Sequence, residues 1–307
     1  MSRGLGDVYK RQASNLVGIQ GEAQSAYITL DVVEALKARV YLEMEDYQNA
    51  AAVAQGLINS KRYTLISDGD AYKKMWLNDV GTEAIWQFAM SKTETGSNAL
   101  GSSFMGIVDK LPRPSYLPVK SVLNLYDKEN DIRYDAYFTT GLIDRQVGDD
   151  IEVTYCSKWP GNPELYEGKS NNVNKLKAFR ISEMYLIAAE AYAMLNQEDK
   201  ASEMLNELKK IRIKGWTETV YNGAALMQEI QDERVRELFA EGNRLFDMKR
   251  WKIGMKRSSS DAQRDDYLPA LGTDIEKEAT DNRWVWPIPK DEMDSNPQLK
   301  GQQNPGY

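Results

Sequence analysis

Histidine is absent from this sequence of 307 residues, and cysteine occurs once, as Cys156. Without histidine, the chain cannot build a Ser-His-Asp or Cys-His nucleophile, a histidine-ligated zinc site or a histidine general base. A single cysteine also excludes internal disulfides and Cys-x-x-Cys motifs. Because no histidine can activate it, we interpret Cys156 as a small, partly buried residue. Nucleophilic chemistry would have to come from carboxylates, lysine, serine or tyrosine.

An excess of positive charge and long apolar runs are also lacking. The 39 Lys and Arg are outnumbered by 46 Asp and Glu, which gives a net charge of −7, so the chain has no electrostatic footprint for nucleic acid and we expect no such partner. No run of 18 apolar residues predicts a transmembrane helix. Glycine-rich phosphate loops are missing, and we expect no cofactor. Aromatic residues are plentiful, with 7 Trp, 17 Tyr and 6 Phe, which favours sugars or protein surfaces over metals or nucleotides as ligands.

Residues 1–12, MSRGLGDVYKRQ, show neither helical nor strand periodicity and contain no hydrophobic signal-peptide core. We interpret them as a non-native leader. On that interpretation the native N-terminus, with any targeting signal, is missing from this sequence.

Helical periodicity predicts an antiparallel hairpin near the N-terminus. Its first helix begins near Thr29 and its second spans Tyr47 to about Asn59. A second pair is expected at residues 180–195 and 198–213. Shifting the first pair by 151 positions superimposes the small and aromatic residues of the two copies: Ala38 on Ala189, Tyr41 on Tyr192, Ala50 on Ala201 and Leu57 on Leu208.

This order of alanine, tyrosine, turn and alanine is typical of a tetratricopeptide unit, in which small residues let the helices approach closely. We therefore predict a mainly α fold, an α-α superhelix of tetratricopeptide-like hairpins with long irregular loops. The alternative is two unrelated amphipathic hairpins. Further helices are expected after Asn222 and after Asn243, whereas residues 91–119, 139–175 and 257–283 are not helical in pattern. Residues 83–90 fit either a short strand or a helix.

Several segments resemble the motifs of the SusD/RagB family of outer-membrane nutrient-binding lipoproteins. Glu233 to Trp251 (ERVRELFAEGNRLFDMKRW) is similar to the family's ER-x-x-EL-x-x-EG-x-R-x-FD-x-x-RW motif, and Trp286 to Tyr307 to its closing PIP…QNPGY segment. Arg180 to Ala193 resembles its R-x-x-E-x-x-L-x-x-AEA helix, and Tyr126 to Arg133 resembles its Y-x-x-x-D-x-R segment. The resemblance spans about residues 25–307.

The resemblance implies an N-terminally truncated helical-repeat domain at residues 25–307. It implies a cell-surface subunit that captures an oligosaccharide or other nutrient and passes it, without catalysis, to a TonB-dependent (SusC-like) outer-membrane transporter. It also implies a lipoprotein of the outer membrane, although the signal and the acylated cysteine of the family are not in this sequence. The glycan itself is not implied.

The acidic residues of the first motif are candidates for glycoside hydrolysis, which uses two carboxylates. Glu233, Glu237 and Glu241 lie four residues apart, as if on one face of a helix. The arginines nearby in sequence are Arg234, Arg236, Arg244 and Arg250. Because Arg–carboxylate pairs of this kind usually connect helices, we interpret these acids as structural rather than catalytic. Asp127, Glu129 and Asp131 alternate but lack the glycine and distal glutamate of a calcium loop, so we read a solvated face and no metal site.

The irregular loops offer better candidates for a ligand site. Sugar recognition needs flat apolar rings for the C–H face of a pyranose, with amides and charges nearby for its hydroxyls. Side chains of these kinds occur on segments stiffened by proline and glycine: Tyr116, Tyr155, Lys158, Trp159, Asn162 and Tyr166. The alternative is that these aromatic rings pack against their own loops.

Two other functions remain open from the sequence. The chain is also compatible with a helical-repeat scaffold that binds only the transporter, or another protein or peptide. A glycosidase that uses a pair of carboxylates is the third possibility.

Overall fold

The structure is a computed structural model that describes residues 18–93, 100–108, 111–145, 148–166, 172–258, 260–264, 276–299 and 301–307. The leader expected at residues 1–12 lies outside these ranges. The chain divides into two compact units, Met1–Glu241 and Gly242–Tyr307. No helix among the described residues has the length and apolar character that a membrane crossing requires.

The first unit is mainly helical, as predicted. Its described helices are α2 (Leu30–Glu43), α3 (Tyr47–Asn59), α4 (Gly69–Leu77), α5 (Leu100–Met105), α6 (Lys120–Leu123), α7 (Tyr134–Tyr137), α8 (Ile181–Met194), α9 (Glu198–Arg212) and α10 (Gly223–Glu237). The described strands are short and form two-stranded antiparallel ladders: β1 (Ala84–Gln87) with β6 (Lys177–Arg180), β2 (Ile107–Val108) with β3 (Leu111–Pro112), and β4 (Phe138–Ile143) with β5 (Ile151–Cys156).

The two predicted hairpins, α2–α3 and α8–α9, are copies of one unit. Helix α8 begins and ends at the positions of α2 shifted by 151 residues. Their turns also match, because Glu45 and Asn196 both adopt positive φ values of 59° and 56°. The residue after each closes the turn with the same hydrogen bond, from the amide of Asp46 to Tyr41 O and from that of Gln197 to Tyr192 O, both 2.9 Å. This confirms the repeat.

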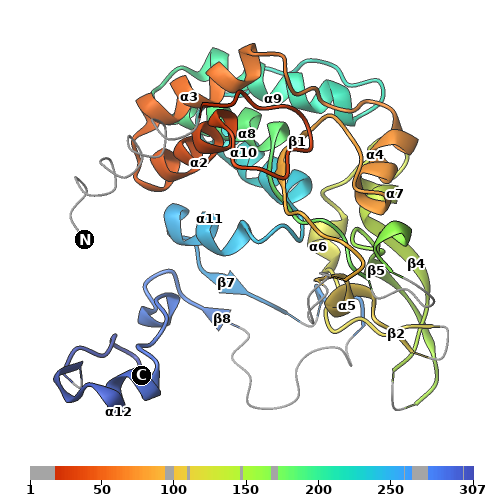
Figure 1. Ribbon diagram of the computed structural model, residues 1–307, viewed down its shortest axis with the longest axis vertical. Helices are drawn as coiled ribbons and strands as arrows, with labels where there is room; N and C mark the ends of the chain where they lie inside the picture. The colour runs from red at the N-terminus through yellow and green to blue at the C-terminus, as the bar shows by residue number, and fades with distance from the viewer. Residues whose placement is uncertain are drawn as a thin grey trace. The chain divides into compact units, whose positions relative to one another are not determined.

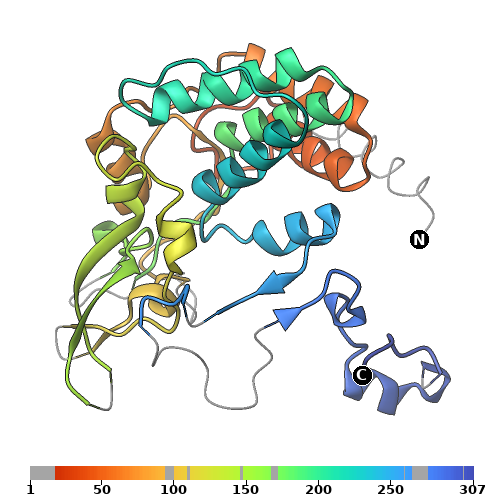
Figure 2. The same cartoon turned by 180° about the vertical axis from the view of Figure 1, so that it is seen from behind.

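The hairpins lie side by side although residues 60–180 separate them in the sequence. Helix α3 packs against α8, and α10 then packs against α8 and α9 (Figures 1 and 2). Fully buried alanines line these contacts and allow the close approach that the sequence predicts: Ala35, Ala38, Ala50, Ala54, Ala188, Ala189, Ala191 and Ala201. The superhelix is therefore continuous in space.

A small ladder lies beside this helical stack. Within residues 83–90, which fit either a strand or a helix, Ala84–Gln87 form β1, and β1 pairs with β6. The segment before α2 runs along the same strand, since the amide of Gln24 donates to Ala84 O (2.8 Å) and that of Gln87 donates to Ser25 O (3.0 Å). The β1–β6 register shifts on both sides of Trp86, so this ladder is irregular although backbone hydrogen bonds fix it from both edges of β1.

The second apolar cluster of this unit is aromatic and lies around α4 and α7. Trp76 makes edge-to-face contacts with Tyr72, Tyr137 and Trp159 at 5.1–6.2 Å between ring centroids. The β4–β5 hairpin adjoins it, in a region where the sequence indicated only irregular structure. The alternation along β4 is weak because Thr139, Thr140 and Gly141 follow one another there.

The second unit contains the two C-terminal motifs. Its described elements are α11 (Arg244–Trp251), β7 (Met255–Lys256), β8 (Glu276–Lys277), the 3₁₀ helix η3 (Asn282–Trp284), α12 (Lys290–Ser295) and the 3₁₀ helix η4 (Pro297–Leu299). The closing residues fold back on the Trp-Pro-Ile-Pro segment, because the Gln303 amide both donates to and accepts from the backbone of Ile288, at 3.1 and 2.8 Å. Asn304 likewise donates to Trp286 O. The spacing of this motif thus encodes a closed loop.

Candidate functional site

Glu237, at the end of α10, is the centre of a buried ionic cluster. Its carboxylate accepts from Arg180 of β6 (2.8 Å), from Arg212 of α9 (2.9 and 3.0 Å) and from Arg133 of the loop before α7 (3.0 Å). All four side chains are inaccessible to solvent or nearly so. One carboxylate thereby connects three segments that are distant in the sequence.

The cluster extends to both sides of Glu237. Arg133 also pairs with Asp131 (2.7 Å) and with Glu233 (2.5 Å), and Glu233 accepts a further bond from Arg236 (2.7 Å). On the other side, Glu83 accepts from Arg180 and Arg212 at 3.0 and 2.8 Å. Glu241 accepts from Arg180 and Lys158, both at 2.7 Å. Charges of both signs alternate, so burial leaves none of these groups without a partner.

The electrostatics of the cluster disfavour a proton on Glu233 and on Glu237. Burial by itself favours the neutral form of Glu233, but the positive charges of Arg133 and Arg236 outweigh it and lower its pKa to about 2. Burial acts likewise on Glu237, and Arg212 and Arg180 hold its pKa well below the ordinary value. A general acid must carry a proton near neutral pH. These carboxylates are ionised and engaged by arginine.

The structural interpretation of the motif acids is therefore confirmed, with a correction to their partners. Of the arginines nearby in sequence, Arg236 pairs with Glu233, but the principal partners are Arg133, Arg180 and Arg212. Helix α10 ends at Glu237, so Glu241 does not share its face. A turn with positive φ at Ala240 (57°) carries Glu241 back to Arg180.

The missed partners had a signal in the sequence. Arg133 belongs to the Y-x-x-x-D-x-R segment, and Arg180 opens the R-x-x-E helix, so the charges of three separate motifs meet in one cluster. Asp131 was expected on a solvated face. It is buried, because its carboxylate pairs with Arg133. Among the described residues, no group of three or more acidic or cysteine side chains is arranged to hold a metal ion.

The six side chains predicted to bind sugar do not form one surface. Lys158 is fully buried, and its ammonium group bonds to Phe239 O and Glu241 (both 2.7 Å) between the rings of Trp76 and Tyr137. Burial, only partly offset by Glu241, lowers the pKa of Lys158 to about 8. This lysine belongs to the ionic cluster and has no face toward a ligand.

Trp159 and Asn162 are interior residues as well. The Trp159 ring packs edge-to-face on Trp76 (5.1 Å) and its indole N–H donates to Ala240 O (3.3 Å). Asn162 donates to Asp79 (2.8 Å) and its side-chain oxygen accepts from the amide of Glu164 (3.0 Å). The expected exposure is wrong for both, because the 3₁₀ turn η1 (Pro163–Leu165) and the aromatic cluster enclose them.

Tyr155 and Tyr166 complete this segment. Tyr155 lies in β5, is 8% exposed, and burial raises the pKa of its hydroxyl. Tyr166 follows the 3₁₀ turn and is half-buried. The alternative interpretation, that the rings of this segment pack against their own surroundings, therefore holds for Tyr155 and Trp159.

Tyr116 differs from the other five candidates because its side chain is 63% exposed. It lies in the proline-flanked loop between β3 and α6, and its ring lies 6.3 Å from that of Phe104, tilted by 53°. The loop is anchored by a hydrogen bond from the amide of Ser115 to Ser103 O (2.9 Å). Its role in ligand binding stays a prediction.

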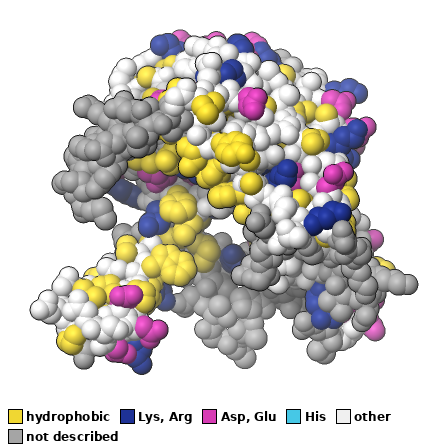
Figure 3. All heavy atoms as spheres, viewed as in Figure 1, with side chains coloured by type: hydrophobic (Ala, Val, Ile, Leu, Met, Phe, Trp, Pro, Cys, Tyr) yellow, Lys and Arg dark blue, Asp and Glu magenta, His cyan; other side chains and the backbone are white. Residues whose placement is uncertain are grey.

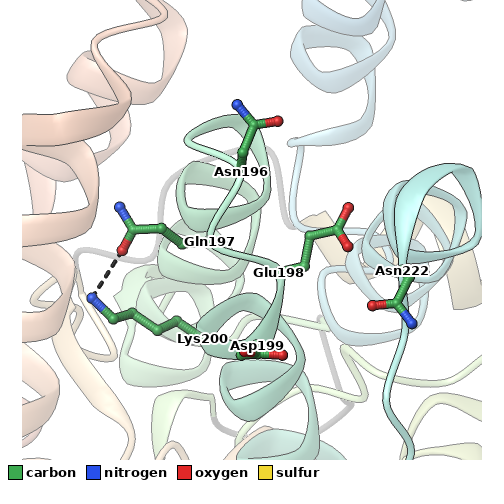
Figure 4. A pocket seen from close by; sticks show the side chains of 6 residues that line it. All are labelled: Asn196, Gln197, Glu198, Asp199, Lys200 and Asn222. Atoms are coloured by element: carbon green, nitrogen blue, oxygen red, sulfur yellow. Dashed lines mark hydrogen bonds between the residues drawn. The ribbon is translucent and has the colours of Figure 1, made fainter.

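Two hollows open on the surface of the first unit. A polar one of about 450 Å³ lies at the α8–α9 turn and is lined by six polar residues: Asn196, Gln197, Glu198, Asp199, Lys200 and Asn222 (Figure 4). Lys200 donates to Gln197 across its rim (2.8 Å). The other, of about 430 Å³, lies beside α4 and has a more apolar lining that includes Leu65, Ile66 and Val80. Neither contains any of the six predicted residues.

The hairpin superhelix and the convergence of the motif charges define a tetratricopeptide-like helical-repeat protein. A sequence profile described as "SusD family" matches residues 150–307, which is more than half of the chain. The chain therefore belongs to the SusD family, and the resemblance noted from the motifs is confirmed.

Individual relatives agree with this assignment. The chain is 24% identical over 311 residues to SusD-like protein P38 of Formosa agariphila, an alignment that covers 87% of this chain and 58% of P38. A crystal structure of a SusD superfamily protein from Bacteroides thetaiotaomicron superimposes with a TM-score of 0.76 at 27% identity, covering 96% of this chain and 64% of that one.

A SusD-like carbohydrate binding protein from Bacteroides vulgatus shares the fold, with a TM-score of 0.69 at 18% identity and coverage of 96% of this chain and 64% of that one. The chain thus spans less than two thirds of the length of these relatives.

Proposed function

We propose that this chain is part of a cell-surface glycan-binding subunit, which captures oligosaccharide and passes it, without cleaving it, to a TonB-dependent outer-membrane transporter. We propose likewise that the whole protein is a lipoprotein exposed at the surface of the outer membrane. Membership of the SusD family supports this ligand class, since one structurally similar protein is described as a carbohydrate binding protein.

One structural observation supports binding without catalysis. The acidic residues of the family motif, Glu233, Glu237 and Glu241, are all committed to buried ion pairs with arginine or lysine. Hydrolysis of a glycosidic bond needs a proton donor and a second carboxylate that both reach the substrate. Because all three carboxylates are held in buried ion pairs, none is available to donate a proton or to contact a substrate. They maintain the frame that carries the binding surface.

Native gels containing soluble polysaccharides test the binding step. Neutral glycans (β-glucan, xylan, mannan) and an anionic one (polygalacturonate) should be used in separate gels, with the chain compared against a non-binding reference protein. We expect retardation in at least one of them. Incubation with the retarding glycan should release no reducing ends, and release of sugar would support the glycosidase hypothesis instead.

The transfer step requires its own experiment. The protein carrying this chain should co-purify with a TonB-dependent transporter from detergent-solubilised outer membranes. Co-purification without any glycan retardation would favour the scaffold hypothesis, in which the transporter is the only ligand. Absence of both would overturn the proposed function.

A further inference from the structure

Three aromatic rings form a ladder on one side of the β1–β6 pair. Trp86 of β1 and Phe179 of β6 are partners in the strand register, and their rings stack at 6.3 Å with an interplanar angle of 23°. Phe88 lies two residues beyond Trp86, and its ring is 4.7 Å from that of Trp86. Phe88 directly follows the last residue of β1, and its amide donates to Leu176 O (2.9 Å), so backbone pairing beside β6 continues as far as this residue.

The ladder runs from the interior to the surface. Phe179 is 4% exposed, Trp86 is half-buried and Phe88 is 43% exposed. The segment beside β1 adds Tyr27, which is 81% exposed, and Trp86 is fixed to this segment by a long hydrogen bond from its indole N–H to Ala26 O (3.4 Å). Hydrophobic side chains cluster on this side of the molecule, over β1 and the segment before α2 (Figure 3).

A hydrogen-bond donor lies at the inner end of the ladder. The guanidinium group of Arg39 in α2 stacks over the Phe179 ring at 4.2 Å and is held by Glu183 (2.7 and 2.6 Å) and by Ala178 O (2.8 Å). These bonds use Nε and Nη2. The third nitrogen, Nη1, has no partner among the described residues, and the side chain is 33% exposed.

We propose that the Trp86–Phe88 face, together with Arg39 at the Phe179 end of the ladder, is a subsite for a neutral glycan. The Trp86 and Phe88 rings, which are tilted by 40° to each other, present an apolar surface for the C–H face of a pyranose, and Arg39 Nη1 supplies a fixed donor for a hydroxyl oxygen. Because the rings are held on paired strands and Arg39 is held by Glu183, little side-chain freedom is lost on binding. The inference rests on the proposed function.

The charges define the class of glycan. Arg39 is neutralised by Glu183 through two hydrogen bonds, so the subsite offers donors without a net positive charge. The whole chain carries a net charge of −7, which disfavours polyuronates. Sugars with equatorial hydroxyls, such as glucose and xylose in β-glucan and xylan, have the flattest C–H faces and fit best.

The test compares four proteins in native gels containing β-glucan, xylan or polygalacturonate: the wild-type chain, Phe88→Ala, Arg39→Lys and the control Val220→Ala. Phe88→Ala removes the exposed ring but keeps the strand backbone. Arg39→Lys retains the charge opposite Glu183 and removes the free fork nitrogen. Val220 is 71% exposed and lies between α9 and α10. Circular dichroism spectra should be the same for all four.

We expect affinity for β-glucan or xylan to fall about tenfold in Phe88→Ala and several-fold in Arg39→Lys, and to be unchanged in Val220→Ala. Wild-type binding that both variants retain would overturn the subsite and leave the proposed function standing. If Phe88→Ala lost binding to polygalacturonate and to no other glycan, the assignment of the subsite to neutral glycans would be overturned. Retained glycan binding with loss of transporter co-purification in Phe88→Ala would assign the face to a protein partner. Wild-type binding to none of the glycans would overturn both proposals.

Discussion

Arg180 of β6 and Glu237 of α10 are joined by two hydrogen bonds, from Nη1 to the carboxylate (2.8 Å) and from Nη2 to the backbone carbonyl (2.9 Å). Both side chains are almost completely excluded from solvent. A guanidinium group that donates to both the side chain and the backbone carbonyl of one residue fixes the end of α10 in one place. The stability of the first unit should therefore respond strongly to changes at this pair.

Replacing Glu237 by glutamine keeps its volume and removes its charge. Among the acidic partners in the described part of the cluster, Arg180 would then keep Glu83 and Glu241, and Arg212 would keep Glu83 alone. Because breaking a buried pair leaves charge uncompensated, we expect the free energy of unfolding to fall by about 3–5 kcal/mol, measured by urea denaturation. Glu129→Gln, at an exposed position, is the control, and equal losses in the two variants would contradict the prediction.

Acidification should destabilise the protein through Glu233. Its pKa is about 2 in the folded state, against an ordinary value of 4.5. The stabilisation is complete above pH 4.5 and is lost as the pH falls toward 2, because the unfolded chain takes up the proton first. It amounts to about 3 kcal/mol. Urea denaturation of wild type and Glu233→Gln at pH 7, 5 and 3.5 should show the difference narrowing, and a constant difference would be evidence against this account.

The turn between α2 and α3 is strained at Glu45. A non-glycine residue with φ of 59° is disfavoured, although asparagine tolerates this conformation and occupies the equivalent position as Asn196. We expect Glu45→Asn to raise the free energy of unfolding by about 0.5–1 kcal/mol. Glu45→Ala, which gains no left-handed preference, should not raise it. Denaturation midpoints measure both, and a gain in the alanine variant would refute the explanation.

Tyr116 is the predicted sugar-binding side chain that the structure leaves exposed. If it contributes one stacking contact, Tyr116→Ala should weaken retention by a bound polysaccharide about five- to tenfold in affinity gels. Leu142→Ala removes a side chain that is 52% exposed on β4 and should have no effect. Unchanged retention of the Tyr116 variant would remove this residue from the binding surface.

The helices were predictable because their signal is local. Alanine spacing and the shared tyrosine identified both hairpins, and a shift of 151 residues correctly aligned α8 with α2 along the sequence. The β4–β5 hairpin was missed because threonines and a glycine hide its alternation. Which strands pair depends on contacts between separate segments, and the pattern within one segment does not identify its partner.

The exposure of the candidate ligand-binding side chains was less predictable than the helices, for a related reason. Trp159 and Lys158 lie in a loop rich in proline and glycine, which suggests exposure, but the loop is covered by Trp76, Tyr137 and Glu241 from distant segments. Burial of a loop is set by tertiary contacts that no window of sequence contains. Conversely, Trp86 lies in β1 and Phe88 directly follows this strand, in a segment whose composition resembles a core. Only the three-dimensional arrangement reveals that Phe88 reaches the surface.

The position of α3 against α8 has a consequence for biosynthesis. When the ribosome has made the first hairpin, the apolar side of α3 is still uncovered, because its packing partner α8 is synthesised only after residues 60–180. Closing so long a loop is slow, and until it closes the exposed apolar side of α3 can form non-native contacts or aggregate. Nascent chains halted before α8 should therefore depend on chaperones, whereas those that extend past α10 should not.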